Sequence, residues 1–203
     1  MTVRFGCVVE GHGDREAVPV LLRRIALCID PAIDVQVEHP VRVPKSRLLK
    51  EGSLERAVEQ AALGVGAAGA ILVILDSDDD PPCTLGPELL ARAKAARADM
   101  PVGVVLPRRE FEAWFLAAAR SLRGHRGLPE DLEPPQDPES IRGAKEWLSH
   151  RMGRDGYSEL LDQPALAAVF DMEAARGTGS FDKCYREIHR LLQELSARQS
   201  PTA

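Results

Sequence analysis

The chain has 203 residues and a formal net charge of −5; 44% of its residues are hydrophobic and 28% are charged. This composition supports one packed domain with a helical extension, and it excludes wholesale disorder. No apolar run approaches the roughly 20 residues that a membrane-spanning helix needs, and Met1 leads straight into strand-like sequence without a signal-peptide layout. We therefore expect a cytoplasmic protein with no membrane partner.

The first half of the chain alternates between strand-like and helix-like segments. Apolar or alternating runs predict four strands, at 3–9, 33–43, 70–75 and 102–106. Apolar residues spaced three or four apart predict helices between them, from residue 14 onward, at 54–65 and at 88–98. Asp14 and Ser53 are the expected N-caps of the first two helices. This alternation predicts an α/β fold with a mainly parallel, four-stranded sheet flanked by helices.

The second half of the chain lacks this alternation. It is expected to be helical over 111–122, to form a proline-rich loop over 124–138, and to be largely helical from there to about Arg198. We therefore predict an α/β core at 1–108 and a C-terminal helical annex at 109–203 that packs on the core.

Acidic residues follow three of the predicted strands. Glu10 ends the first strand, Asp76, Asp78 and Asp80 follow the third, and Glu110 comes just after the fourth. Because the carboxyl ends of parallel strands share one edge, these carboxylates are expected to converge. Converging like charges are unfavourable unless a cation neutralises them or some are protonated, and an oxygen-only ligand set favours Mg²⁺ or Mn²⁺ over zinc.

Other interpretations of these motifs remain open. The run from Asp78 to Asp80 also suits a solvated turn leading into Pro81. A calcium loop fails because Pro81 stands at the required glycine. A dinucleotide-binding G-x-G-x-x-G is disfavoured because Glu16 holds the third glycine position.

Two short motifs have a known counterpart. Glu10-Gly11-His12-Gly13-Asp14 after the first strand, with Asp76-x-Asp78 after the third, resembles the TOPRIM (topoisomerase–primase) fold. The resemblance implies that the glutamate and the two aspartates form a divalent-metal site for phosphodiester chemistry.

A closer resemblance is to a family of small, stand-alone TOPRIM-like proteins of unknown function. The stretches that carry it are Val9-Glu10-Gly11, Leu75-Asp76, Arg109-Glu110-Phe111-Glu112-Ala113-Trp114 and Gly179-Ser180-Phe181-Asp182-Lys183. This resemblance implies a separate ATPase partner and a role in a defence or repair system.

Basic residues in the second half suggest contacts to phosphate. The predicted phosphate-binding residues are Arg123, Arg126, Lys145, Ser180 and Lys183. Such contacts supply affinity without sequence information. The same residues also suit ordinary solvated helix faces, with Ser180 as a helix cap.

These observations favour a metal-dependent, nuclease-like TOPRIM protein that acts on nucleic acid, DNA rather than RNA. Its predicted metal ligands are Glu10, Asp76, Asp78 and Asp80, and its predicted catalytic residues are Glu10, Asp76, Asp78 and Glu110. Glu10 would bind a metal or act as a general base. Glu110 is preferred to Glu112 because residues two apart cannot share a helix face, and Glu110 is nearer the strand end.

Two alternatives remain from other functional classes. One is a non-catalytic binding or effector subunit that works with the ATPase partner, and the other is a small-molecule phosphohydrolase. Topoisomerase action would need a tyrosine nucleophile at the acidic edge, whereas Tyr157 and Tyr185 both fall in the annex.

Overall fold

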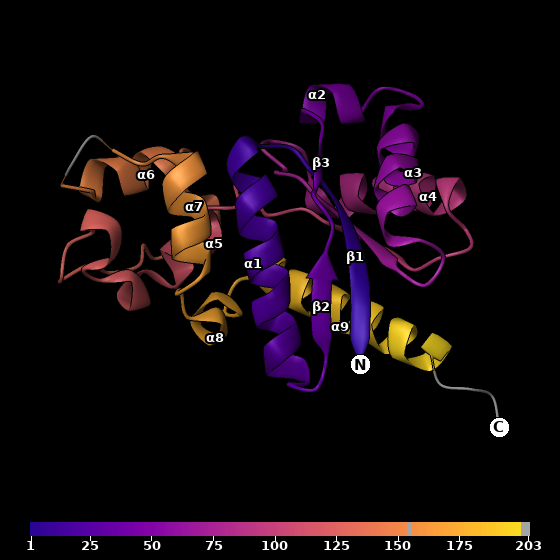
Figure 1. Ribbon diagram of the computed structural model, residues 1–203. Helices are drawn as coiled ribbons and strands as arrows, with labels where there is room; N and C mark the ends of the chain where they lie inside the picture. Colours follow the sequence, from indigo (N-terminus) through magenta and orange to yellow (C-terminus); the bar gives the residue numbers. More distant parts are fainter. Residues whose placement is uncertain (154–155, 200–203) are drawn as a thin grey trace.

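The structure is a computed structural model, and it describes residues 1–153 and 156–199. Parallel strands form one sheet in the order β2-β1-β4-β5 (Figure 1). Their bounds are β1 (Thr2–Val9), β2 (Asp34–Val37), β4 (Ala70–Ile74) and β5 (Val102–Val105). A fifth, two-residue strand, β3 (Val41–Arg42), pairs with the end of β1. The predicted parallel α/β fold with a four-stranded core is confirmed.

Helices cover both faces of this sheet. One face packs against α1 (His12–Ile29) and α9 (Gly179–Gln199), with Phe5 and Leu72 pointing into that layer. The other face packs against α3 (Ser53–Val65) and α4 (Pro82–Ala96). Because side chains alternate along a strand, a central strand buried on both faces is apolar throughout, as β4 is.

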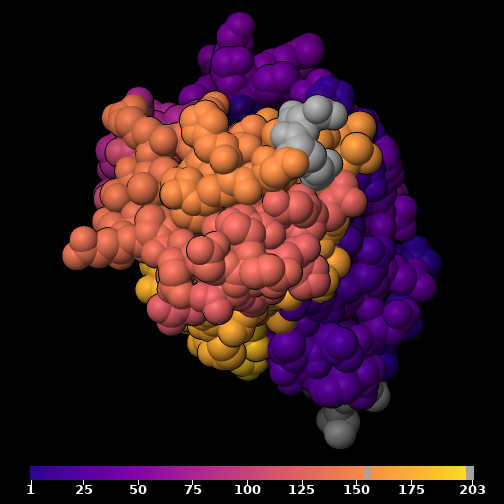
Figure 2. Space-filling model, turned by 90° about the vertical axis from the view of Figure 1, so that its left-hand side faces the viewer, coloured from indigo at the N-terminus to yellow at the C-terminus, as the bar shows by residue number. Residues whose placement is uncertain are grey.

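Of the expected annex at 109–203, the last helix, α9, packs on the sheet itself, and the rest lies beside α1 on its side away from the sheet. From here on, this remaining part is called the annex. It contains α5 (Ala113–Ala117), α6 (Ala144–Arg151), α7 (Glu159–Ala167) and α8 (Met172–Ala175). Three short 3₁₀ turns lie between them, at Ala119–Leu122, His125–Gly127 and Pro138–Ser140. Figure 2 views the molecule from the annex side, where these segments cover much of the surface beside α1.

A cluster of aromatic rings joins the annex to α9. Its members are Phe111, Trp114, Phe115, Phe170 and Phe181. Neighbouring centroids lie 4.6–5.5 Å apart, in the tilted and edge-on arrangements that aromatic pairs favour. The sheet, α1, the annex and α9 therefore share one continuous apolar core.

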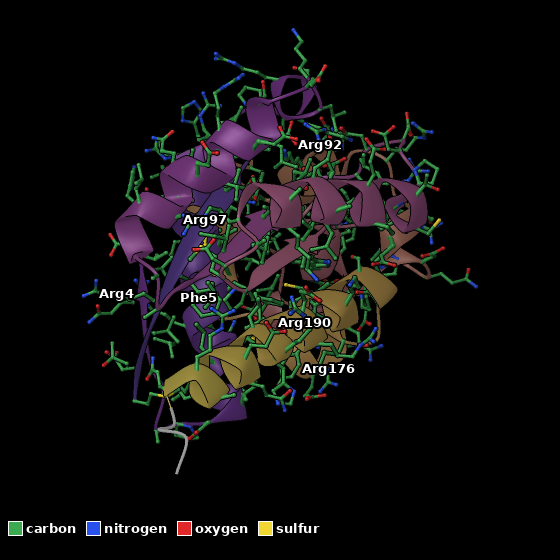
Figure 3. All side chains as sticks on the ribbon, turned by 90° about the vertical axis from the view of Figure 1, so that its right-hand side faces the viewer. Arg4, Phe5, Arg92, Arg97, Arg176 and Arg190 are labelled. Atoms are coloured by element: carbon green, nitrogen blue, oxygen red, sulfur yellow. The ribbon has the colours of Figure 1, made fainter. Side chains whose placement is uncertain are left out.

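Arg190 ties α9 to the edge strand of the sheet (Figure 3). Its guanidinium donates to the carbonyl of Val102 at 2.9 Å and to Glu187 at 2.7 Å. The Glu187 side chain also lies close to Gly103. A Cβ atom on residue 103 would come within 3.0 Å of it. This close approach explains a glycine inside β5.

Several predicted boundaries are wrong by a few residues. Helix α1 begins at His12 with Gly11 as N-cap, and Asp14 instead sits in the first turn, where it accepts the Gly11 N–H at 2.8 Å. Likewise Gly52, not Ser53, caps α3. Helix α4 begins six residues before the expected start, because proline at a helix's first position costs no hydrogen bond.

The remaining differences concern the ends of helices and strands, which the sequence does not mark clearly. The expected strand at 33–43 is split into β2 and β3 around Pro40, which has no N–H to donate to a ladder. The helix expected at 111–122 is a short α5 followed by a 3₁₀ turn, and α2 (Lys45–Leu48) was not expected. In residues 1–153 and 156–199, no helix combines the length and apolar character needed to cross a bilayer.

Candidate functional site

A cavity of about 780 Å³ lies at the carboxyl edge of the sheet, between the ends of β1 and β4 and the annex. We call it the acidic cavity. It is lined by Glu10, Gly11, Asp14, Arg42, Pro44, Asp76, Asp78, Glu110, Arg142, Gly143, Lys145, Glu146 and Glu159. The four predicted catalytic residues, Glu10, Asp76, Asp78 and Glu110, thus face one cavity although three distant segments supply them.

Glu10 follows the last residue of β1 and is half-buried. Its Oε2 atom is buried and has no hydrogen-bond partner among the described residues. Burial raises the pKa of Glu10 above its ordinary value, and the negative charges of Asp78 and Asp14 add to this effect, whereas the backbone N–H and the charge of Lys45 oppose it. Glu10 therefore carries an uncompensated carboxylate oxygen at the edge of the cavity.

Asp76 follows β4, and its Oδ1 accepts the backbone N–H of Phe111 at 2.8 Å. This bond attaches the end of β4 to the segment after β5. Burial raises the pKa of Asp76 well above its ordinary value, and the charges of Glu112 and Asp14 raise it further. Asp76 thus lies among other acids that disfavour its ionised form.

Glu112 is fully buried beside this group. Its Oε1 accepts the Tyr157 hydroxyl at 2.9 Å, whereas its Oε2 is buried without a partner among the described residues. Burial raises the pKa of Glu112 to about 8, although the positive charge of Lys145 opposes the shift. Tyr157 lies in the annex, as expected, but its hydroxyl reaches Glu112 beside the acidic cavity.

Lys145 supplies a positive charge inside the acidic cavity. Its Nζ lies 3.1 Å from Glu159 Oε1. Burial alone would lower the pKa of Lys145, but the charges of Glu112, Asp76 and Glu159 raise it above the ordinary value. Lys145 therefore remains protonated and offsets part of the acidic charge.

Glu110 holds the beginning of α6. Its two carboxylate oxygens accept the backbone N–H groups of Gly143 at 2.9 Å and of Lys145 at 3.2 Å. A carboxylate at a helix N-terminus is favourable because the unpaired N–H groups there carry partial positive charge. Glu110 thereby fixes the position of the backbone that bears Lys145.

The loop after Asp76 is held by cations. Lys45, whose side chain is 7% exposed, places its Nζ 2.9 Å from both Asp78 Oδ2 and Asp80 Oδ2. Asp79 pairs instead with Arg109 at 3.0 Å and with Arg142 at 2.7 Å. Of the three aspartates, only Asp78 lines the acidic cavity, so the structure does not bring Asp80 to the same wall.

The predicted phosphate-binding residues do not form one surface. Lys145 lines the acidic cavity, whereas Arg123 pairs with Glu133 and Arg126 pairs with Asp162 at 2.8 Å. Ser180 and Lys183 line a separate, largely apolar cavity of about 440 Å³ beside α4. Ser180 also accepts the indole N–H of Trp114 at 2.8 Å, so its hydroxyl already has a partner in the core.

The comparison with known families gives one match. Residues 9–195 match the model of a family described as "Domain of unknown function (DUF4276)". The chain belongs to this family. The match runs from the end of β1 to the last turns of α9, so the DUF4276 segment contains every residue that lines the acidic cavity. Neither the comparison with curated proteins nor that with solved structures gave a match.

Several residues around the acidic cavity were not selected from the sequence. Asp14, Lys45, Glu112, Tyr157 and Glu159 all take part in its charge balance. Asp14 also accepts the side-chain amide of Gln163 at 2.8 Å. Asp14 and Glu112 stand in motifs of the sequence, four residues after Glu10 and two residues after Glu110. Lys45, Tyr157 and Glu159 reach the site only through contacts between segments far apart in the chain.

No three His, Cys, Asp or Glu side chains within the described ranges are arranged to hold a metal ion. Asp78 is turned to Lys45, and Glu110 is turned to the backbone of α6. The donor chemistry nevertheless suits a hard cation, because Glu10, Asp76 and Asp78 offer only oxygen and one buried oxygen of Glu10 lacks a partner within those ranges.

Proposed function

We propose that this DUF4276 chain hydrolyses phosphodiester bonds of nucleic acid at the acidic cavity with the help of Mg²⁺ or Mn²⁺. The observation that carries the proposal is the convergence of Glu10, Asp76 and Asp78 on one cavity, where burial and mutual repulsion raise the pKa values of Glu10 and Asp76. A cation would relieve this repulsion, and carboxylate oxygens are the ligands that Mg²⁺ prefers.

The residues would divide the work as follows. Glu10, Asp76 and Asp78 would hold the ion, which supplies Lewis-acid polarisation of the phosphate and lowers the pKa of an attacking water. Lys145 faces the same cavity as a permanent cation and would contact the phosphate oxygens as their negative charge grows. Glu110 would act as a positioning residue, because it holds the α6 backbone that carries Lys145.

The TOPRIM-like relationship, DNA rather than RNA as the substrate, an ATPase partner and a cytoplasmic location are further parts of this proposal. The TOPRIM-like relationship rests on the motifs Glu10-Gly11 and Asp76-x-Asp78, and the ATPase partner rests on the resemblance that also includes Arg109-Glu110-Phe111-Glu112-Ala113-Trp114 and Gly179-Ser180-Phe181-Asp182-Lys183.

A second candidate is a non-catalytic subunit that binds nucleic acid for a separate partner. The observation that favours it is Lys45, whose ammonium group already pairs with both Asp78 and Asp80. The ammonium group offsets one of the two negative charges, so this aspartate pair needs a metal ion less than two unpaired carboxylates would.

The test is cleavage by the native chain. We expect nicking of supercoiled plasmid in the presence of Mn²⁺ or Mg²⁺ and none in EDTA. No cleavage with either ion, alone or with an ATPase partner, would favour the binding subunit. Turnover of a small phosphate ester but not of plasmid or RNA would favour the small-molecule phosphohydrolase.

Metal binding should also stabilise the fold. A ligand that binds only the folded state at one hundred times its dissociation constant contributes about 2.7 kcal/mol, which for a chain of this size corresponds to a rise in melting temperature of roughly 5–10 °C. We expect this rise with Mn²⁺ in a thermal melt followed by circular dichroism. Asp76→Asn should abolish it, and an equal rise in that variant would place the ion elsewhere.

A further inference from the structure

A second cavity, of about 660 Å³, opens beside the acidic cavity between the start of α1, β3 and the start of α3. We call it the basic cavity. Its charged and imidazole side chains are His12, Arg15, His39, Arg42, Arg47 and Arg56. Within the part of the chain that the structure describes, none of its lining residues is an aspartate or glutamate. Four guanidinium groups of described residues thus line this cavity, and no carboxylate of those residues lines it with them, in a chain whose net charge is −5.

Arg15 makes one side-chain contact in the basic cavity and leaves one of its nitrogens without a partner among the described residues. One of its terminal nitrogens contacts Nε2 of His39. Its Nε atom is buried and has no hydrogen-bond partner among the described residues. A buried donor without an acceptor is costly, so the Arg15 guanidinium gains from turning toward a phosphate acceptor in the cavity.

Arg42 connects the two cavities, because it lines both of them. Its guanidinium lies 3.4 Å from the backbone carbonyl of Glu10, the residue that brings the unpartnered carboxylate to the acidic cavity. A linear polyanion with one phosphate at Glu10 would therefore reach the arginines of the basic cavity with its next phosphates.

We propose that the basic cavity binds consecutive phosphates of a nucleic-acid strand and leads that strand into the acidic cavity. This inference rests on the proposed function and deepens it. Guanidinium groups suit phosphate because their planar N–H donors match two phosphate oxygens at once. Among residues 1–153 and 156–199, the lining contains no Phe, Tyr or Trp on which a base could stack, so the contacts are to the backbone and independent of sequence.

The experiment measures binding without catalysis. Binding of a short fluorescein-labelled DNA strand is followed by fluorescence anisotropy in EDTA, between about 50 and 200 mM salt. The variant is Arg47→Ala with Arg56→Ala, since both side chains are exposed and line the basic cavity. Each lost phosphate contact reduces the slope of log affinity against log salt by about 0.7 for a single strand, so the double variant should be shallower by about 1.4.

The matched control is Arg4→Ala with Arg186→Ala, which removes the same charge. Arg4 lies near the start of β1 and Arg186 on α9, and neither lines the basic cavity. We expect the control to keep the native slope. An equal loss of slope in both double variants would overturn the proposal, because general charge would then account for the binding.

A competition experiment separates a strand from a small anion. Unlabelled strand should displace the labelled strand at far lower concentration than a mononucleotide or inorganic phosphate does. Displacement by the mononucleotide at the same concentration as the strand would overturn the strand assignment.

The two proposals fail differently. In one outcome, the native chain never cleaves while the Arg47 and Arg56 double variant shows a shallower dependence of log affinity on log salt. The strand-binding proposal is then supported and the hydrolysis proposal is excluded. If the native chain cleaves and the double variant keeps the native dependence of log affinity on log salt, the hydrolysis proposal is supported and the strand-binding proposal is overturned.

Discussion

Asp78→Asn and Glu10→Gln are each expected to lower the rate of Mn²⁺-dependent plasmid nicking by about a hundredfold or more. Each change preserves the shape of a side chain that lines the acidic cavity while removing a negative charge. A metal ion stabilises the charge that develops during phosphodiester cleavage by several kcal/mol, and about 1.4 kcal/mol corresponds to a tenfold change in rate. Initial rates of nicking for the native chain and both variants give the measurement.

Asp79→Asn is the matched control. It removes one carboxylate charge from the same loop, but Asp79 is exposed, pairs with Arg109 and Arg142, and does not line the acidic cavity. Its cleavage rate should stay close to that of the native chain. All three variants should remain folded, because Asp78 and Asp79 are exposed and Glu10→Gln relieves repulsion. Undiminished cleavage in Asp78→Asn would exclude the acidic cavity as its source.

A chain that ends at residue 108 is expected not to fold. It would keep the sheet but lose α9, which buries six apolar side chains against one face of the sheet and the annex: Phe181, Cys184, Ile188, Leu191, Leu192 and Leu195. At about 1.5–3 kcal/mol for each large apolar side chain, this loss is comparable to the whole stability of a typical domain, about 5–15 kcal/mol. Circular dichroism would report the loss of helices and strands, and binding of a hydrophobic dye would report apolar surface exposed in a collapsed state.

The control for this truncation is a chain that ends at Gln199, which retains every described helix and strand. It should unfold in urea in one transition that tyrosine, tryptophan and circular-dichroism signals report at the same midpoint. Cooperative unfolding of the chain that ends at residue 108 would instead show that the first 108 residues are a domain of their own.

The central strands could be located from the sequence because their apolar runs have a direct physical cause. A strand buried on both faces, such as β4, must be apolar at every position. The first residue of a helix was harder to predict, because a carboxylate such as that of Asp14 can cap a helix from the first turn as well as from the N-cap position. The annex was hardest, because its short helices depend on tertiary packing around rings such as Trp114 and Phe181 rather than on periodicity.

The acidic edge followed from topology alone, since strands that run parallel bring Glu10, Asp76 and Glu110 to one edge. The partners of these acids could not be predicted in the same way. Lys45 meets the loop of Asp78 from 33 residues away, and Tyr157 meets Glu112 from 45 residues away. Neither pairing has a local signal. The sequence around Arg123 and Arg126 likewise does not indicate that Glu133 and Asp162 pair with these arginines, because both acids lie outside that stretch.

The ammonium group of Lys45 is a cation that cannot diffuse away. It is anchored at the first residue of α2 and stays within hydrogen-bond distance of Asp78 and Asp80. Burial would lower the pKa of Lys45, but the two aspartates raise it, so this charge persists at neutral pH. A divalent ion that reached Asp78 would therefore share that carboxylate with a tethered competitor, and it would be held less tightly than by an aspartate free of Lys45. On the proposed function, such a site would release its ion readily, and its occupancy would follow the metal concentration around it.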